Sequence, residues 1–177
     1  MMELILVTGG VRSGKSRWAQ DEALARGGDE VTVIATAEAV DDEMRDRIEA
    51  HRRDRPAGWH TVEAPARAGE AILAAGTDTV LLDCVTVLTG MAIGKSGAGV
   101  EAAALDAMAA EIDGILDARA ARIGVLVVVT NEVGWSVHPP TALGRWYQDG
   151  LGIANQRLAG AADRVVLMVS GLELRLK

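Results

Sequence analysis

The stretch Gly9-Gly10-Val11-Arg12-Ser13-Gly14-Lys15-Ser16 decides how this chain folds. It follows the apolar run Leu4–Thr8 and precedes a helical pattern that begins near Arg17. A strand, the pattern G-x-x-x-x-G-K-[ST] and then a helix are the successive parts of a phosphate-binding loop (P-loop). The alternative is a plain glycine turn, and the strand directly before the pattern argues against it.

Each residue type in this loop suits the binding of a phosphate. The glycines let successive backbone N–H groups converge on phosphate oxygens, and the new helix directs the positive end of its dipole at the same anion. Lys15 adds a positive charge at the β- and γ-phosphates, and the Ser16 hydroxyl suits Mg²⁺. The sequence therefore predicts a nucleoside triphosphate site.

A second Gly-Lys-Ser, at 94–96, lacks this context. Its nearest upstream glycine, Gly90, lies one residue too close, and no strand precedes it. Gly97 and Gly99 follow where a helix should begin. We expect residues 94–99 to form a surface loop.

Composition restricts the class of protein. Of the 177 residues 49% are hydrophobic, with four Trp, one Tyr and no Phe, so Val, Leu, Ile and Ala must build the core, as suits a buried parallel sheet. The net charge of −7 argues against general nucleic-acid binding. No apolar stretch approaches the ~20 residues of a transmembrane segment. One cysteine cannot form an internal disulfide, and we expect a cytoplasmic protein.

Apolar runs alternate with helical patterns along the whole chain. This alternation predicts one P-loop NTPase-like α/β domain over residues 1–177, with a mostly parallel central sheet flanked by helices and ligands beyond the carboxyl ends of the strands. The expected strands are Leu4–Thr8, Val31–Thr36, Val80–Asp83, Val125–Thr130 and Val165–Val169, with a short edge strand at Trp59–Glu63. The expected helices are Lys15–Ala25, Asp41–Arg53, Ala66–Ala74, Glu101–Ala121 and Ala142–Ala161.

Asp83 ends an apolar strand. In a P-loop protein, an acid at this point can hold Mg²⁺ or its water shell opposite the loop serine. By itself such an acid is usually a turn former, but the loop favours the metal role. Ser16 and Asp83 are therefore the expected Mg²⁺ ligands.

His51 lies near the end of a strongly polarised helix. Its spacing from Met44 and Ile48 places it on the sparse apolar stripe of this helix, where a partly buried structural histidine is one interpretation. Nearby arginines disfavour the imidazolium form and can hold phosphate oxygens, so a nucleophile toward phosphorus is the other. These arginines are Arg52, Arg53 and Arg55.

Other candidates have weaker support. Asn131-Glu132 follows the fourth expected strand, where a turn and a contact with a second substrate are equally favoured. Trp18 suits packing better than base stacking. His60 and His138 are interpreted as structural or surface residues, and Cys84 as a small buried hydrophobe.

Two further segments are specific enough to point to a family. They are the helix Asp41-Asp42-Glu43-Met44 leading to His51-Arg52, and the strand end Thr130-Asn131-Glu132-Val133-Gly134. With the P-loop, they make the chain resemble, nearly from end to end, the bifunctional adenosylcobinamide kinase / adenosylcobinamide-phosphate guanylyltransferases of cobalamin biosynthesis. The remaining matches are Ile34–Ala37, Arg47-Ile48, Arg55-Pro56, Trp59, Asn155–Ala159 and Val169–Gly171.

The resemblance implies two reactions. A nucleoside triphosphate, ATP or GTP, phosphorylates the aminopropanol hydroxyl of adenosylcobinamide, and GTP then guanylylates the resulting phosphate through a GMP-histidine intermediate. His51 matches that histidine, and Lys15 serves the phosphates. The resemblance also implies a homotrimer. The implied nucleotide contacts are Gly9, Gly10, Val11, Arg12, Ser13, Gly14, Lys15, Ser16, Thr36, Ala37, Glu38, Arg52, Arg53, Asp54, Arg55, Glu63 and Asp83.

Parts of the chain depart from the family pattern. Asp83 stands where Glu is usual, Ile153 stands where many relatives have Arg, and residues 87–100 match poorly. A P-loop small-molecule kinase without guanylyl transfer is the alternative, and a nucleotide-gated binding protein is a more distant one. For the kinase step Glu132, Asp83 and water remain candidate bases.

Overall fold

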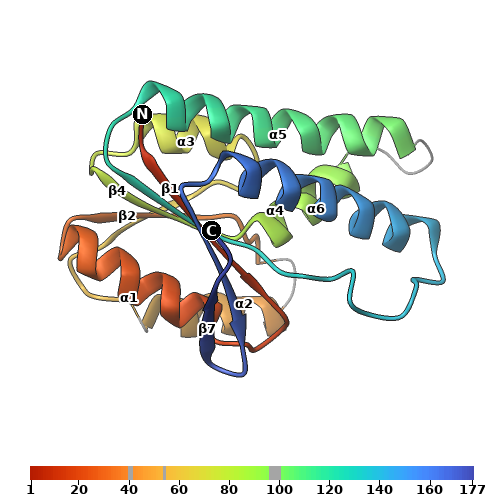
Figure 1. Cartoon of the computed structure of the whole chain (residues 1–177), viewed down its shortest axis with the longest axis horizontal. Coiled ribbons are helices and arrows are strands. Elements are labelled where there is room, and N and C mark those ends of the chain that lie inside the picture. Colours follow the sequence, from red (N-terminus) through yellow and green to blue (C-terminus); the bar gives the residue numbers. More distant parts are fainter. Residues whose placement is uncertain (40–41, 54, 96–100) are drawn as a thin grey trace.

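The computed structural model describes residues 1–39, 42–53, 55–95 and 101–177, arranged as helices around one twisted sheet (Figure 1). The elements are β1 (Glu3–Gly9), α1 (Lys15–Gly27), β2 (Val31–Ala35), α2 (Asp42–Arg53), β3 (His60–Glu63), α3 (Ala68–Ala74), β4 (Thr79–Asp83), α4 (Val85–Lys95), α5 (Glu101–Ala121), β5 (Val125–Val129), α6 (Ala142–Ala161), β6 (Arg164–Val169) and β7 (Leu172–Arg175).

The strand order places the P-loop near the middle of the sheet. Within the described residues, seven strands follow the order β3-β2-β4-β5-β1-β6-β7, and their pairings are parallel except that of β6 with β7. β5 therefore lies between β1, which leads into the P-loop, and β4, which ends at Asp83. The carboxyl ends of these three strands meet at one edge of the sheet.

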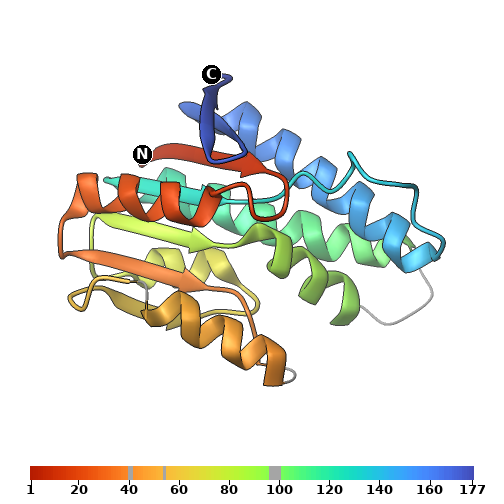
Figure 2. The ribbon, with the colours of Figure 1, turned by 90° about the horizontal axis from the view of Figure 1, so that it is seen from below.

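Helices cover both faces of the sheet (Figures 1 and 2). Successive residues of a strand point to opposite faces, and β1 divides in this way between two apolar clusters. Leu4 and Leu6 join the cluster shared with α3, α4, α5 and α6, while Ile5 and Val7 join the cluster under α1. Burial on both faces explains why the strands read as continuous apolar runs.

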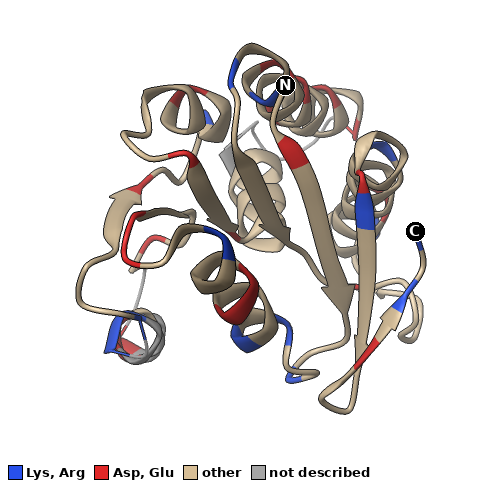
Figure 3. Ribbon diagram, turned by 60° about the vertical axis from the view of Figure 1, so that its left-hand side comes forward, with Lys and Arg blue, Asp and Glu red and all other residues tan. Residues whose placement is uncertain are grey.

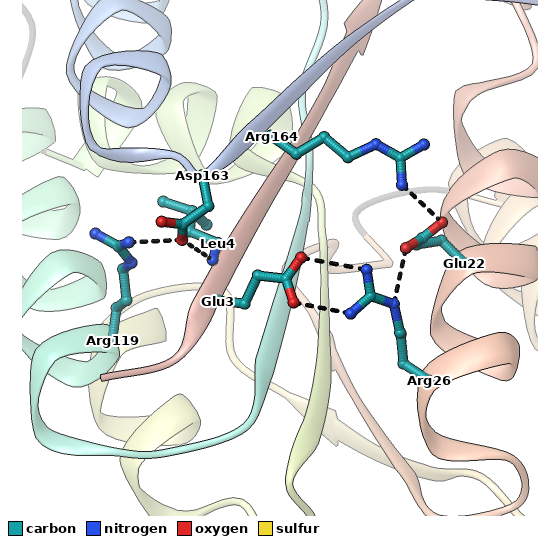
Figure 4. Close-up of polar contacts among 7 residues, drawn as sticks. All are labelled: Glu3, Leu4, Glu22, Arg26, Arg119, Asp163 and Arg164. Carbon is teal, nitrogen blue, oxygen red and sulfur yellow. Dashed lines mark hydrogen bonds and ion pairs between the residues drawn. The ribbon is translucent and has the colours of Figure 1, made fainter. Parts of the chain in front are cut away.

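Hydrogen bonds and ion pairs attach neighbouring elements to the opposite, amino-terminal edge of the sheet (Figure 4). Asp163 accepts hydrogen bonds from Leu4 N and Arg119 Nη2, both at 2.8 Å. Beside them, Arg26 binds Glu3 at 2.8 Å and Glu22 at 3.0 Å. These contacts attach β1 to α1, α5 and the start of β6.

The predicted α/β alternation is confirmed, but two elements were not foreseen. α4 includes the first two residues of the loop expected at 94–99: Gly94 and Lys95 end this helix, and residues 96–99 lie outside the described part of the chain. β7 pairs with β6 at the sheet edge although all its residues are exposed. No helix among the described residues has both the length and the apolar character needed to cross a bilayer.

Candidate nucleotide site

The P-loop rests on the turn between β6 and β7. Gly9 has a φ of +145°, and a Cβ there would lie 2.3 Å from the carbonyl oxygen of Met168, so only glycine fits. Farther along the loop, Gly171 N donates a hydrogen bond of 3.0 Å to Ser13 O. The C-terminal hairpin thus supports the loop from behind.

Lys15 is buried within the loop. It is 7% exposed, and its Nζ donates to Gly10 O at 2.5 Å and to Ser13 Oγ at 3.4 Å. Burial lowers the pKa of Lys15, and the nearby Cys84 and Asp83 oppose this shift. The ammonium group is therefore held in place before an anion arrives.

A cavity of about 620 Å³ opens beside the P-loop. The loop, β2, α2, β3, β4, α4 and β5 all contribute to its wall, so it lies at the carboxyl edge of the sheet, where α/β folds bind ligands. Its lining residues are Val11, Arg12, Ser13, Gly14, Lys15, Ser16, Arg17, Ala35, Ala37, Ile48, Arg52, Arg55, Glu63, Asp83, Cys84, Thr86, Val87, Val129 and Asn131.

Acid–base pairs lie in the wall of this cavity. Arg55 Nη2 lies 3.9 Å from Asp83 Oδ2, and Arg52 is paired with Glu63. Burial lowers the pKa of Arg55, an effect that Asp83 opposes and Arg52 reinforces. Figure 3 shows basic residues both on the loop before α1 and on α2. The cavity wall thus combines cationic side chains with two carboxylates.

The donors in the cavity fit Mg²⁺. Ser16 and Asp83 both line it, and Mg²⁺ is usually held by one or two carboxylates together with waters and substrate phosphates. Among the described residues no group of three or more His, Cys, Asp or Glu could hold a metal. This donor set suits an ion that is also held by the phosphates of a nucleotide.

The structure brings most of the predicted contacts together and leaves some out of the wall. Thr36 is buried, and its hydroxyl accepts from Cys84 N at 2.9 Å and donates to Cys84 O at 2.8 Å. The predicted contacts that line the cavity are Val11, Arg12, Ser13, Gly14, Lys15, Ser16, Ala37, Arg52, Arg55, Glu63 and Asp83. Gly9, Gly10, Thr36, Glu38 and Arg53 are not among the lining residues. For all of these residues, inside and outside the lining, the contact with a nucleotide remains a prediction.

His51 lies in α2 between two residues that line the cavity. These are Ile48, three residues before it, and Arg52, directly after it. The side chain of His51 and the whole of Asp54 lie outside the described part of the structure. The backbone thus brings the His51 position to the cavity, and its role stays a prediction.

The other side chains examined in the sequence have clear settings. Trp18 packs against the apolar cluster under α1, with the Arg164 guanidinium 5.0 Å from its ring centre, which supports the packing interpretation. His60 and His138 are exposed. Cys84 packs against the same apolar cluster, as the hydrophobe interpretation expects, but it is only partly buried and also lines the cavity.

Two cavity residues at the start of α4 were not singled out from the sequence. They are Thr86 and Val87. A signal was present, because they closely follow the acid that ends β4, and residues after strand ends face ligands in this fold class. The poor family match of residues 87–100 hid the helix.

Comparison with known proteins agrees with this geometry. Residues 5–176 match the family described as CobU, cobinamide kinase / cobinamide phosphate guanyltransferase. The chain belongs to this family. Two curated relatives are named bifunctional adenosylcobalamin biosynthesis protein CobU. The one from Escherichia coli (strain K12) is 41% identical and the one from Salmonella typhimurium 43%, each over 98% of this chain and 99% of the relative.

Two solved ATPases share the fold of this CobU family member. One is a prototypical ATPase of a type III secretion system, with a TM-score of 0.55 and 11% identity over 93% of this chain and 50% of the ATPase. The other is the ATPase domain of a different protein, with a TM-score of 0.54 and 12% identity over 93% of this chain and 68% of that chain. At such identities only the P-loop NTPase fold is shared.

Proposed function

We propose that this chain catalyses two successive transfers in cobalamin biosynthesis. It phosphorylates the aminopropanol hydroxyl of adenosylcobinamide with a nucleoside triphosphate, and then transfers GMP from GTP to the phosphate, giving adenosyl-GDP-cobinamide. The observation that carries the proposal is a cavity walled by both the P-loop and α2. One nucleotide held there has Lys15 on one side and the His51 segment on another.

The kinase step uses the loop to neutralise the transferred phosphoryl group. The substrate hydroxyl oxygen attacks the γ-phosphorus, the bond to the β-phosphate oxygen breaks, and the nucleoside diphosphate leaves with the electron pair. Asp83, Glu132 or water accepts the hydroxyl proton. Loop N–H groups and Lys15 stabilise the charge on the phosphate oxygens. Mg²⁺ held by Ser16 and Asp83 would supply further neutralisation of the triphosphate.

The guanylyl step passes through His51. A neutral imidazole nitrogen attacks the α-phosphorus of GTP, a P–N bond forms, and pyrophosphate leaves with the electrons of the broken P–O bond. A phosphate oxygen of adenosylcobinamide phosphate then attacks the same phosphorus and returns the electron pair to the imidazole. Arg52 and Arg55, which line the cavity, hold the phosphate oxygens in both halves of the reaction.

The covalent intermediate provides the direct test. We expect protein incubated with Mg²⁺ and α-labelled GTP, then denatured, to carry an acid-labile and base-stable label. His51→Ala should carry none, and His60→Ala, altered at an exposed histidine on β3, should be labelled like the wild type. An unlabelled wild type would contradict guanylyl transfer and favour the plain kinase.

The kinase step is tested separately. His51→Ala should still transfer label from a γ-labelled nucleoside triphosphate to adenosylcobinamide, because the histidine acts only in the second reaction. Absence of this transfer in the wild type would contradict the first reaction. The homotrimer is a further prediction, and light scattering on the purified protein tests it.

A further inference from the structure

Asn131 lies just beyond the end of β5, in the wall of the nucleotide cavity. It is partly buried and lines the cavity. Within the described part of the chain, the side-chain amide of Asn131 has no hydrogen-bond partner, although its backbone N–H and C=O are both bonded. A side-chain amide without a protein partner in a phosphate-binding cavity is available to a ligand.

The backbone around Asn131 is fixed from two neighbouring helices. From α4, Thr86 Oγ1 accepts from Asn131 N at 2.9 Å. From α6, Asn155 Nδ2 donates to Asn131 O at 2.9 Å and to Glu132 Oε1 at 3.3 Å. Asn155 Oδ1 in turn accepts from the buried Thr130 hydroxyl at 2.7 Å. The amide group of Asn155 is therefore fully engaged in holding this strand end.

The same strand end is also attached to β1. Thr130 N donates to Val7 O at 3.0 Å and Glu132 N to Gly9 O at 3.1 Å. The Thr8 hydroxyl donates to Glu132 Oε1 at 2.7 Å. The position of Asn131 relative to the P-loop is thus set by hydrogen bonds on both sides of it in the chain.

The strand order tells which part of the nucleotide Asn131 meets. β5 lies between β1 and β4, so Asn131 lies between the P-loop with Lys15 and the strand end with Asp83. The loop lysine reaches the β- and γ-phosphates, and the acid serves Mg²⁺ at the same phosphates. A terminal phosphate bound by these two groups would lie nearest to Asn131.

We infer that the Asn131 side chain donates a hydrogen bond to the γ-phosphate of the bound nucleoside triphosphate, and that Asn155 is the positioning residue that aims it. The inference rests on the proposed nucleotide site and names a further catalytic contact within it. As the γ-phosphoryl group transfers, negative charge stays on its oxygens, and a donor carried by a backbone already held in place stabilises this charge with little reorganisation.

The test compares nucleotides with and without a γ-phosphate. We expect Asn131→Ala to weaken binding of the β,γ-imido analogue of GTP in the presence of Mg²⁺ by about 10- to 100-fold, the range for a hydrogen bond to a charged group. Binding of GDP should be unchanged, as should the Tm. Equal loss of both nucleotides, or no loss of either, would overturn the inference. The assay contains no cobinamide and needs no labelled histidine, so it stays separate from the test of the proposed function.

The positioning role has its own variants. Asn155→Asp removes the donor of the bonds to Asn131 O and Glu132 and should reproduce the selective loss of the imido analogue. Thr130→Val removes only the hydroxyl that donates a hydrogen bond to Asn155 Oδ1. This variant should give a smaller loss of affinity for the imido analogue. Gln148→Ala is the control, because Gln148 Nε2 anchors the following loop at Val133 O, 3.0 Å away, without lining the cavity. A Gln148→Ala loss equal to that of Asn155→Asp would overturn the positioning role.

Discussion

The Arg55 guanidinium lies 3.9 Å from the Asp83 carboxylate in the wall of the nucleotide cavity. The Arg55 side chain is 7% exposed and that of Asp83 16%, and Arg55 Nε has no hydrogen-bond partner among the described residues. Each group therefore compensates much of the other's buried charge. A phosphate and a cation entering the cavity would each find an oppositely charged side chain already in place.

This pair should be energetically coupled in the free protein. Asp83→Asn and Arg55→Gln should each destabilise the fold, and the double variant should lose about 1 kcal/mol less than the sum of the single changes. Urea unfolding at pH 7 measures the cycle. The matched control is Arg45→Gln with Asp42→Asn, an exposed pair on α2 at 2.5 Å, whose coupling should be near zero. Strictly additive losses at Asp83 and Arg55 would contradict the pairing.

The Cys84 thiol should react slowly with alkylating reagents, although it lies in the cavity wall. Burial, reinforced by Asp83, raises the pKa of Cys84 from 9.0 to about 11. Since the thiolate is the reactive form, alkylation at pH 8 should be slow and should rise about tenfold per pH unit towards pH 10. In the urea-unfolded chain the rise should level off near pH 9. Bound GTP should slow the reaction further.

Iodoacetamide labelling followed by mass spectrometry measures these rates. Because Cys84 is the sole cysteine of the chain, Cys84→Ser gives the background. Labelling at pH 8 as fast in the folded as in the unfolded protein would contradict the raised pKa of Cys84.

Asp163 should make stability depend on acid pH. The bond from Leu4 N, together with Arg119, lowers the pKa of Asp163, so its stabilisation is present above the unfolded pKa near 4 and is lost as pH falls through the lower folded value. The side chain is 50% exposed, which screens the effect. We expect Asp163→Asn to cost about 1 kcal/mol at pH 7.

Urea unfolding at pH 7 and at pH 3 checks this prediction. The difference between wild type and Asp163→Asn should shrink at the lower pH. The control is Asp106→Asn, at an exposed position of α5, with no cost at either pH. A cost for Asp163→Asn that persists unchanged at pH 3 would contradict the linkage.

Replacement of two helical glycines by alanine should change the free energy of unfolding in opposite directions. A Cβ on Gly69 would lie 2.2 Å from the carbonyl oxygen of Gly114, where α3 crosses α5, whereas a Cβ on Gly152 in α6 would meet nothing within 4 Å. Gly69→Ala should therefore cost about 1–3 kcal/mol through overpacking. Gly152→Ala should gain about 0.5–1 kcal/mol from helix propensity. Thermal unfolding compares the two, and equal effects would contradict the close crossing.

The fold was largely predictable because the dominant signals are local. The apolar run before the P-loop and the apolar runs that follow it each predict a buried parallel strand. α4 escaped because its face pattern is weak: Leu88 and Ile93 are both buried, but Gly90 and Gly94 interrupt the helical sequence. β7 escaped because it has only four residues, all exposed, and its pairing with β6 is what makes it a strand.

A site residue could be predicted where the residues next to it in the sequence form a recognisable motif or strand end. Ser16 and Lys15 follow from the loop pattern, and Asp83 follows from its place at a strand end. Thr36 could not be assigned in this way, because its hydroxyl bonds Cys84, 48 residues away. The engagement of Asn155 with Asn131, 24 residues earlier, likewise depends on how α6 docks against the sheet.

The bond from Gly171 to Ser13 couples the β6–β7 hairpin to the phosphate-binding loop. A protein clipped by a protease after Val169 would keep every side chain named in the chemistry, yet its phosphate-binding loop would lose the brace behind it. An affinity tag fused after Lys177 extends from this same hairpin. Engineering of the carboxyl terminus should therefore be judged by nucleotide affinity as well as by yield.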